Sequence, residues 1–269
     1  MPSALGTVRN LYFYPVKGLS PQPLATVNLA PAQGFPFDRM FGLACVDSGF
    51  DPGNPRPLPK QRFLMLARDN RLAELQTYLD PDTKQFTIHA QGELVHESDF
   101  LHDESIEKTR DWFAEMFGLG PERRPMLAEA TPHRFTDVSV TSERLMNAIS
   151  LINLSSVADF GERLGKLIDP LRFRANLYFE GWSPFSELEL ISRELSVGSV
   201  RLRILRRTTR CAATEVDPKT GRRDIAVPRL LKECYGHVDM GVYAEVLTGG
   251  VVEPGMPVVI HEEVTGGSL

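Results

Sequence analysis

Short stretches in which apolar and polar residues alternate dominate the first hundred residues of the chain. They are rich in β-branched and aromatic residues and predict strands near residues 8–14, 25–29, 40–46, 61–67 and 85–90. The turn-forming residues 80–84 separate residues 73–79 from residues 85–90, which predicts a hairpin. Residues 47–59 carry four prolines and two glycines, which indicates a surface loop. This pattern favours an antiparallel barrel over repeated βαβ units.

Helical spacing of apolar residues occurs in three further places. Residues 105–117 carry Ile106, Phe113 and Met116 largely on one face, which predicts a helix. Residues 156–159 match a capping box at the start of a second helix, and a third helix is expected to begin at Pro228 and to end before Gly236. Further strands are predicted near residues 177–180, 201–205 and 258–261, and a linker is predicted over residues 118–133.

Composition and charge narrow the class of protein. The 269 residues are 42% hydrophobic and 24% charged, which is typical of a globular chain with one large domain or two smaller ones. The three cysteines, at positions 45, 211 and 234, exclude a disulfide framework and a zinc site made of cysteines alone, and they fit a reducing compartment. A formal charge of −5 argues against generic binding to nucleic acids or anionic membranes.

No targeting signal and no common catalytic motif is recognisable in the sequence. Residues 1–7 lack the pattern of a signal peptide, and no apolar stretch is long enough to span a bilayer. We therefore expect a cytoplasmic protein with no membrane and no nucleic-acid partner. The motifs GxxxxGK[ST], GxGxxG, HExxH and GxSxG do not occur, and the six histidines lack metal-ligand spacing.

Two basic segments in the first half of the chain are candidate anion sites. Lys17 lies between a proline and a glycine in residues 14–18 (Tyr-Pro-Val-Lys-Gly), a turn that can present its ammonium and free N–H groups to an anion. The other interpretation is a β-turn with a solvated lysine. Asp38 and Arg39 stand where an apolar strand is predicted to begin, either as a structural ion pair or as an anion clamp.

Two further basic segments lie in the second half. In a strand over residues 172–176, alternation would place Arg172, Arg174 and Asn176 on one face, a row suited to a phosphate or a hydrogen-bonding heterocycle. Arg210 stands beside Cys211 at a predicted strand end, where its charge favours a thiolate that can bind a metal or act as a nucleophile. A solvated strand face and a buried structural cysteine are the other interpretations. The structural role fits the apolar surroundings of the other two cysteines better.

In their order along the chain, these segments resemble a known family. Residues 14–20 and 38–39 are similar to the signature of the MOSC N-terminal β-barrel domain. Six later segments are similar to the MOSC domain that follows it in this family: residues 153–157, 172–176, 209–211, 216–221, 241–244 and 255–258. The resemblance implies a mainly β fold with a few helices. An N-terminal β-barrel domain at residues 1–120 would precede a MOSC core, similar to the pyruvate-kinase barrel, at residues 121–265.

The resemblance also implies a molybdenum-cofactor enzyme like the amidoxime-reducing component and its bacterial relatives. In that family, two sulfurs of the pterin dithiolene and one protein cysteine bind molybdenum, and Cys211 is the matching cysteine. By the same matching, the residues expected to hold the cofactor are Lys17, Arg39, Arg174 and Asn176, with Ser155, Ser156 and Arg210 as weaker candidates.

Two departures from the family pattern affect these expectations. Gly18 stands where the amidoxime-reducing proteins usually carry Ser, so one cofactor hydrogen bond is lost or comes from the backbone. No cysteine follows Gly255, whereas some bacterial relatives append an iron–sulfur domain. We therefore expect a separate flavin or iron–sulfur reductase to supply electrons.

Three functional hypotheses follow. The first is reduction of N-hydroxylated small molecules, such as hydroxylamines and amidoximes, with molybdenum held by Cys211. The second, also implied by the family, is a sulfur carrier or cofactor-handling protein in which Cys211 bears a persulfide. The third is a non-catalytic barrel that binds small molecules or anions and does not need Cys211.

Overall fold

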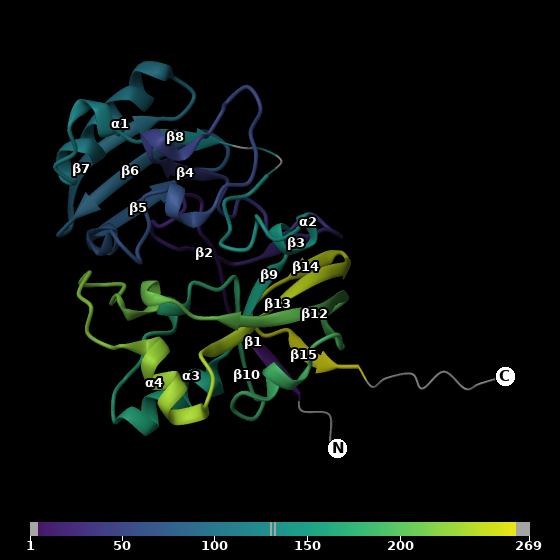
Figure 1. The fold of residues 1–269 in the computed structure, drawn as a ribbon. Helices are drawn as coiled ribbons and strands as arrows, with labels where there is room; N and C mark the ends of the chain where they lie inside the picture. The colour runs from purple at the N-terminus through teal and green to yellow at the C-terminus, as the bar shows by residue number, and fades with distance from the viewer. Residues whose placement is uncertain (1–4, 130, 132, 262–269) are drawn as a thin grey trace.

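A closed β-barrel is the largest element of the fold. The computed structural model describes residues 5–129, 131 and 133–261. Seven strands close the barrel in the order β10-β9-β13-β12-β11-β15-β1, where β1 also pairs with β10, and β2 lies beside β1 (Figure 1). These strands are β1 (Gly6–Phe13), β2 (Gln22–Leu24), β9 (Ile149–Asn153), β10 (Leu177–Glu180), β11 (Glu194–Val197), β12 (Val200–Thr209), β13 (Asp239–Thr248) and β15 (Pro257–Ile260).

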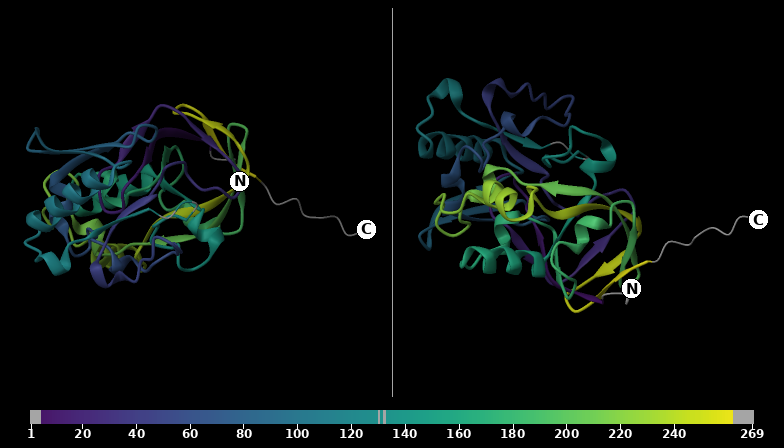
Figure 2. Two further views of the ribbon diagram at one scale, coloured as in Figure 1. Left: turned by 90° about the horizontal axis from the view of Figure 1, so that it is seen from above. Right: turned by 60° about the horizontal axis from the view of Figure 1, so that its bottom comes forward.

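Alternating apolar residues fill the interior of the barrel. In β12, Val200, Leu202 and Ile204 are buried, while the residues between them are more exposed. β9 is buried along its whole length, because α3 (Leu154–Leu164) covers its outer face. α4 (Val227–Tyr235) packs beside α3 on one side of the barrel, and β15 lies on the opposite side (Figures 1 and 2).

A smaller unit lies above the barrel in Figure 1. Its main sheet is an antiparallel meander of β5 (Leu75–Leu79), β6 (Gln85–Ala90) and β7 (Glu93–Asp99), against which α1 (Asp103–Met116) packs. A second, two-stranded sheet pairs β4 (Phe41–Ala44) with β8 (Met126–Glu129). The predicted hairpin at residues 73–90 and the predicted helix at residues 105–117 are thereby confirmed.

Strand pairing connects the two halves of the sequence. β1 closes the barrel of the second half, and β3 (Val27–Leu29) pairs with β14 (Gly250–Val252). The prediction of a linker at residues 118–133 is wrong in part, because β8 lies there and completes a sheet with β4. The fold class, mainly β with a few helices and a barrel, is confirmed, whereas the domain boundary near residue 120 stays a prediction.

Two predicted strands are absent. Residues 61–67 form no strand, because the N–H groups of Arg62 and Phe63 are used by a local 3₁₀ turn, Lys60–Arg62. Residues 172–176 do not alternate as a strand either. Asp169 caps a 3₁₀ turn, Pro170–Phe173, by accepting the N–H of Leu171, and the strand begins only at residue 177.

The helix predictions were right in position but wrong in one cap. α3 begins at residue 154, and its cap is Asn153, which accepts the N–H of Ser155, so the predicted capping box does not form. The predicted helix from Pro228 to the residue before Gly236 is confirmed within α4. No helix among the described residues is long and apolar enough to cross a membrane. Residues 1–4 and 262–265, which the terminal predictions included, lie outside the described residues.

Candidate functional site

A cavity of about 230 Å³ opens between the barrel and the N-terminal unit, and both contribute to its wall. Six of the eight residues predicted for the site line it: Lys17, Arg39, Arg174, Asn176, Arg210 and Cys211. Ser155 and Ser156 do not line it. Residues that are up to 194 positions apart in the chain are therefore brought together around one space.

The charge of this cavity is strongly positive. Its cationic lining side chains are Lys17, Arg39, Lys60, Arg172, Arg174, Arg206 and Arg210, and its carboxylates are Asp38 and Asp137. A cleft lined by charges of one sign focuses the electric field and raises the local concentration of counter-ions. The basic surroundings predicted for Cys211 are therefore present, although the whole chain is acidic.

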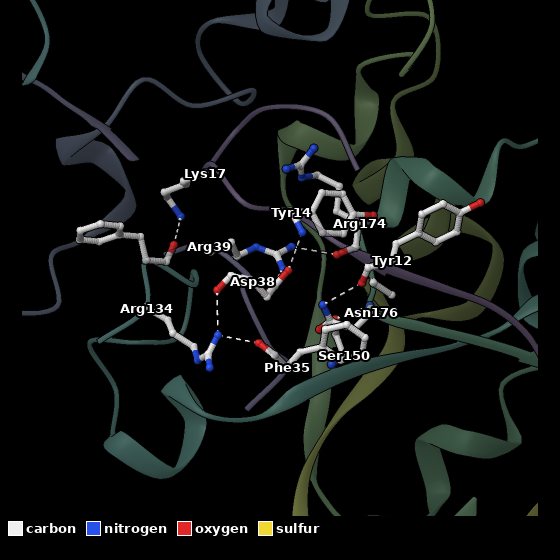
Figure 3. Close-up of polar contacts among 12 residues, drawn as sticks. Tyr12, Tyr14, Lys17, Phe35, Asp38, Arg39, Arg134, Ser150, Arg174 and Asn176 are labelled. Carbon is white, nitrogen blue, oxygen red and sulfur yellow. Dashed lines mark hydrogen bonds and ion pairs between the residues drawn. The ribbon is translucent and has the colours of Figure 1, made fainter. Parts of the chain in front are cut away.

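The ring of Tyr14 lies against two of these guanidinium groups. The Cζ atoms of Arg39 and Arg174 are 4.6 and 4.3 Å from its ring centroid (Figure 3). Tyr14 is completely buried, and cation–π contacts are strongest when they are shielded from water. Arg39 also pairs with the carboxylate of Asp38 and donates to the carbonyl of Arg174 at 2.9 Å. Burial alone would lower the pKa of Arg39, but the Asp38 carboxylate raises that pKa above its ordinary value.

Arg174 is held in an unusual conformation without an acceptor for its charge. Its φ of +52° is left-handed, because it follows the 3₁₀ turn Pro170–Phe173. Its side chain forms no hydrogen bond or ion pair with a described residue, and its Nη2 atom is buried without a partner. Burial and, to a smaller extent, the nearby charge of Arg39 lower the pKa of Arg174 to about 10. An anionic ligand in the cavity would remove this cost.

The ammonium group of Lys17 forms hydrogen bonds within the protein. Its Nζ donates to the carbonyl of Phe135 at 2.8 Å (Figure 3) and to the carboxylate of Asp137 at 2.5 Å. Burial lowers the pKa of Lys17. Burial opposes ionisation of Asp137, but the charges of Lys17 and Lys60 hold the pKa of Asp137 well below its ordinary value. Lys17 therefore fixes residues 135–137 at the cavity wall and adds charge to it.

Cys211 begins a 3₁₀ turn, Ala212–Glu215, directly after β12. Its carbonyl accepts hydrogen bonds from the N–H and the hydroxyl of Thr214, at 3.0 and 2.9 Å, which fixes its backbone. Its Sγ atom is 3.4 Å from the Nζ of Lys60, which is also 3.5 Å from an oxygen of Asp137. A thiol beside an ammonium group at a cavity suits a metal ligand or a nucleophile.

The other two thiols lie outside the cavity. Cys45 directly follows β4, and its Sγ is 3.8 Å from a guanidinium nitrogen of Arg68. Cys234 is in the last turn of α4. Both are half-buried and unpaired, as Cys211 is, so position at the cavity, and not burial, distinguishes Cys211 from them.

Asn176 and Arg210 line the cavity with side chains that are already bonded to the barrel. The Oδ1 of Asn176 accepts the N–H and the hydroxyl of Ser150, at 3.0 and 2.9 Å; Figure 3 shows this pair. Arg210 donates to the carbonyls of Met240 and Phe173, at 2.8 and 2.9 Å. Burial lowers the pKa of Arg210. These two residues shape the wall and have few free donors left for a ligand.

Ser155 and Ser156 lie in the first turn of α3 and form hydrogen bonds within the protein. The Ser156 hydroxyl is buried, donates to the carboxylate of Glu187 at 2.9 Å and accepts the N–H of Phe185 at 2.8 Å. The Ser155 N–H is donated to the cap residue Asn153. The structure therefore does not bring these two serines to the cavity, because the start of α3 packs against residues 183–187 and away from it.

Arg172 reaches the cavity through a turn and not along a strand face. Its Nη2 donates to the carboxylates of Asp217 and Asp224, at 2.9 and 2.8 Å, and the residue is only 4% exposed. The predicted row of Arg172, Arg174 and Asn176 is therefore wrong as a strand pattern, although all three line the cavity.

Among the described residues, four buried polar atoms at the cavity wall lack a hydrogen-bond partner. They are Thr136 Oγ1, Arg172 Nε, Arg174 Nη2 and Thr208 Oγ1. Buried polar atoms are nearly always paired in folded proteins, so this concentration indicates a polar or anionic ligand. A thiol for a soft metal, with cations and hydroxyls for a pterin and its phosphate, fits a molybdenum cofactor. No group of three or more His, Cys, Asp or Glu side chains that could hold a metal occurs within the described part of the chain.

Several cavity residues were not predicted from the sequence. Lys60 follows a proline-rich loop that is mostly exposed, and Asp137 belongs to no motif that we recognised. Tyr243, which lines the cavity, and Tyr14, which packs against two of its arginines, belong to segments that resemble the family, and this was the available signal for them. Their contacts with arginines from distant segments were not readable from the pattern.

Comparison with known proteins places this geometry in a family. The model of the MOSC N-terminal beta barrel domain matches residues 5–118, and the model of the MOSC domain matches residues 130–259.

The mitochondrial amidoxime-reducing component 1 of Homo sapiens is 22% identical, over 95% of this chain and 83% of its own length. The molybdenum cofactor sulfurase of Bos taurus is 24% identical over 88% of this chain, and that of Drosophila willistoni is 35% identical over 66% of it. The chain spans only 30% and 22% of these two sulfurases. The two matched domains together account for most of the chain, which therefore belongs to the MOSC proteins, with a MOSC N-terminal β-barrel domain followed by a MOSC domain.

Proposed function

We propose that this protein binds the molybdenum cofactor in its basic cavity and reduces N-hydroxylated small molecules with electrons from a separate reductase. The observation that carries the proposal is the meeting of the Cys211 thiol and the unpaired guanidinium of Arg174 in one cavity. Similarity to the amidoxime-reducing component over most of both chains supports the choice of reaction.

The protein's part in this reaction follows from the positions of its side chains. Cys211 would be the protein ligand to molybdenum, and the free donors of Arg174, Thr136 and Thr208 would hold the polar and anionic parts of the cofactor. When bound, the cofactor supplies two-electron chemistry at its metal. Reduction of an N–O bond in a hydroxylamine or amidoxime consumes two electrons and two protons and yields an amine or amidine and water.

Lys60 is the cation nearest to the sulfur among the contacts described. Burial alone would lower the pKa of Lys60, but the Asp137 carboxylate and Cys211 raise it, so its Nζ keeps its proton at neutral pH. Lys17 holds Asp137 from the other side. The Lys17–Asp137–Lys60 arrangement thus orients an ammonium at the thiol and keeps positive charge where an anionic group would bind.

A sulfur carrier is the second candidate function. It is favoured by the similarity to two molybdenum cofactor sulfurases, although this chain spans less than a third of each. In that case Cys211 would carry a persulfide, and the ammonium of Lys60 at 3.4 Å would stabilise its negative charge.

The two functions are separated by one set of measurements on protein from a host that makes the molybdenum cofactor. Molybdenum per chain, the intact mass under mild conditions and reduction of benzamidoxime with dithionite-reduced methyl viologen would be measured together. We expect stoichiometric metal and turnover, both lost in Cys211→Ala and kept in Cys45→Ala and Cys234→Ala. Metal-free protein whose mass is larger by one sulfur atom on Cys211 would instead establish the carrier. Phosphate-ligand binding that survives Cys211→Ala, with no metal and no added sulfur, would leave a non-catalytic anion-binding barrel.

The cytoplasm is the location that we propose with this function. All three cysteines are unpaired in the structure, which fits a reducing compartment. The reductase would be a flavin or iron–sulfur protein of the same compartment, and its identity would be tested by adding candidate donors to the loaded enzyme in place of methyl viologen.

A further inference from the structure

Arg206 differs from the other cations of the cavity because it has no acceptor among the described residues and remains exposed. Lys17, Arg39, Lys60, Arg172 and Arg210 all donate to carboxylates, carbonyls or the Cys211 thiol. Arg174 is unpaired but packs on the buried ring of Tyr14. The side chain of Arg206 forms no hydrogen bond or ion pair with any described residue, although it lines the cavity.

Tyr243 faces Arg206 across the two strands that form this wall. The two residues are directly paired in the register of β12 and β13, so their side chains lie on the same face of the sheet. Tyr243 also lines the cavity, is half-buried, and its hydroxyl has no hydrogen-bond partner among the described residues. A guanidinium and a phenol, both with free donors, therefore stand side by side at the exposed part of the cavity.

This pair offers the donor set that a carboxylate requires. The guanidinium can donate two parallel hydrogen bonds to one carboxylate, and the phenol can add a third to either oxygen. The buried cavity wall already offers Arg174 for an anionic group of the cofactor. The exposed position of Arg206 instead suits a group that enters and leaves with each turnover.

The strand sets the distance between this pair and the candidate metal ligand. Arg206 precedes Cys211 by five residues, which corresponds to about 16 Å along an extended strand. A side chain as long as that of arginine can reach over part of this distance. A substrate that spans the remainder would carry its N–O group and its carboxylate on opposite ends of a short rigid spacer, such as an aromatic ring.

We propose that Arg206 and Tyr243 form a carboxylate-binding subsite, so that the favoured substrates are N-hydroxylated compounds that bear a carboxylate remote from the N–O group. This inference rests on the proposed reductase function for its kinetic test. Binding of the carboxylate to the pair is a separate property and is measured separately.

The kinetic test compares benzamidoxime with its 4-carboxy derivative in the molybdenum-loaded protein, with dithionite-reduced methyl viologen as electron source. Charge-assisted hydrogen bonds at an exposed site lead us to expect that Arg206→Gln raises KM for the carboxylated probe about tenfold. kcat and the KM for benzamidoxime should stay unchanged. Arg206→Lys should recover part of the loss, because it keeps the charge but not the paired donors.

Arg207→Gln is the matched control. It removes the same charge from the neighbouring position, but Arg207 donates to the carbonyl of Leu188 and pairs with Glu189 outside the cavity. An equal rise in KM for both probes, a fall in molybdenum content in Arg206→Gln, or an equal effect of Arg207→Gln would overturn the subsite. So would unchanged kinetics in Arg206→Gln.

Calorimetry keeps the two proposals distinguishable. Titration of 4-carboxybenzamidoxime into the resting protein should show a Kd about tenfold higher in Arg206→Gln than in the wild type. If the wild type turns over neither probe, the reductase function fails, while this difference in Kd still supports the subsite. Equal Kd values in the two proteins refute the subsite whatever the turnover.

Discussion

Two neighbouring arginines at the cavity, the buried Arg172 and the half-buried Arg174, should respond to the same substitution in opposite directions. Arg172 donates to two carboxylates, whereas the side chain of Arg174 has no acceptor among the described residues. Each of the two side chains also carries one buried nitrogen without a partner there. We expect Arg174→Met to stabilise the cofactor-free protein and Arg172→Met to destabilise it. Each change removes a positive charge from the cavity wall and leaves a flexible apolar side chain, so the pair forms its own control.

The magnitudes follow from the contacts. Burial lowers the pKa of Arg174 to about 10, and since each tenfold change in proton affinity is worth about 1.4 kcal/mol, the charged form is destabilised by about 3 kcal/mol. Because neutral pH lies below both the folded and the unfolded pKa, this cost is fully present at pH 7. Loss of the contact with Tyr14 offsets about 1–2 kcal/mol of it, which leaves a gain of about 1–2 kcal/mol.

Arg172→Met should cost about 3 kcal/mol, because it leaves two carboxylates without their shared partner. This value is at the low end for a broken buried pair, since the side chains of Asp217 and Asp224 are 21% and 41% exposed and water can solvate them. The segment that follows Cys211 would lose the interaction that ties it to the 3₁₀ turn before β10.

Urea unfolding of the metal-free proteins at pH 7 measures both changes, and thermal unfolding should show a rise of about 4 °C for Arg174→Met. Molybdenum content separates stability from function: Arg174→Met should lose the metal, while the folded fraction of Arg172→Met should keep it. A loss of stability in Arg174→Met similar to that in Arg172→Met would refute the reasoning, because Arg174 would then be satisfied without a ligand.

Three further substitutions test other parts of the structure. Ser156→Ala should lower the unfolding free energy by about 1–3 kcal/mol, because it removes a donor to the buried Glu187 carboxylate, yet leave molybdenum per folded chain unchanged. Burial raises the pKa of Glu187 above its ordinary value of 4.5, so the stability of the wild type relative to Glu187→Gln should fall as the pH rises above 4.5. If the difference in unfolding free energy between the two proteins, measured in urea, stays constant between pH 4.5 and pH 8, this prediction is contradicted. Gly241→Ala should abolish a cooperative thermal transition, because φ is +75° and a Cβ would lie 2.3 Å from the Leu151 carbonyl oxygen. A normal melting curve would show that the backbone at Gly241 can adapt.

The sequence predicted those parts of the fold that depend on local pattern. The hairpin of β5 and β6 has clear alternation on both sides of a turn, and α1 has one apolar face. Residues 61–67 were misread, since their apolar residues are buried through isolated contacts and local turns and not through a ladder. The capping box at Ser156 failed for a related reason, because Asn153 offered a better cap three residues earlier.

Six of the residues that line the cavity were predicted from the sequence, but their contacts with other residues were not. Family resemblance named Lys17, Arg39 and Cys211, yet nothing in the sequence shows that Lys17 is bonded to Asp137 or that Lys60 reaches the thiol. Such pairings join segments more than a hundred residues apart, and they depend on how the barrel and the N-terminal unit pack. The pattern of charges along the sequence does not predict these pairings.

The N-terminal segment is part of the barrel and of the site, although the two family models separate it from the MOSC domain. β1 closes the barrel between β10 and β15, and Tyr14 follows β1 directly. Tyr14 contacts Arg39 from the N-terminal unit and Arg174 from the barrel, so one buried ring joins both walls of the cavity. Lys17, three residues further on, fixes Asp137 beside Lys60 and thus sets the surroundings of Cys211. Residues 6–17 therefore connect closure of the barrel to the charge of the cavity, and the cavity cannot form from the residues of the matched MOSC domain alone.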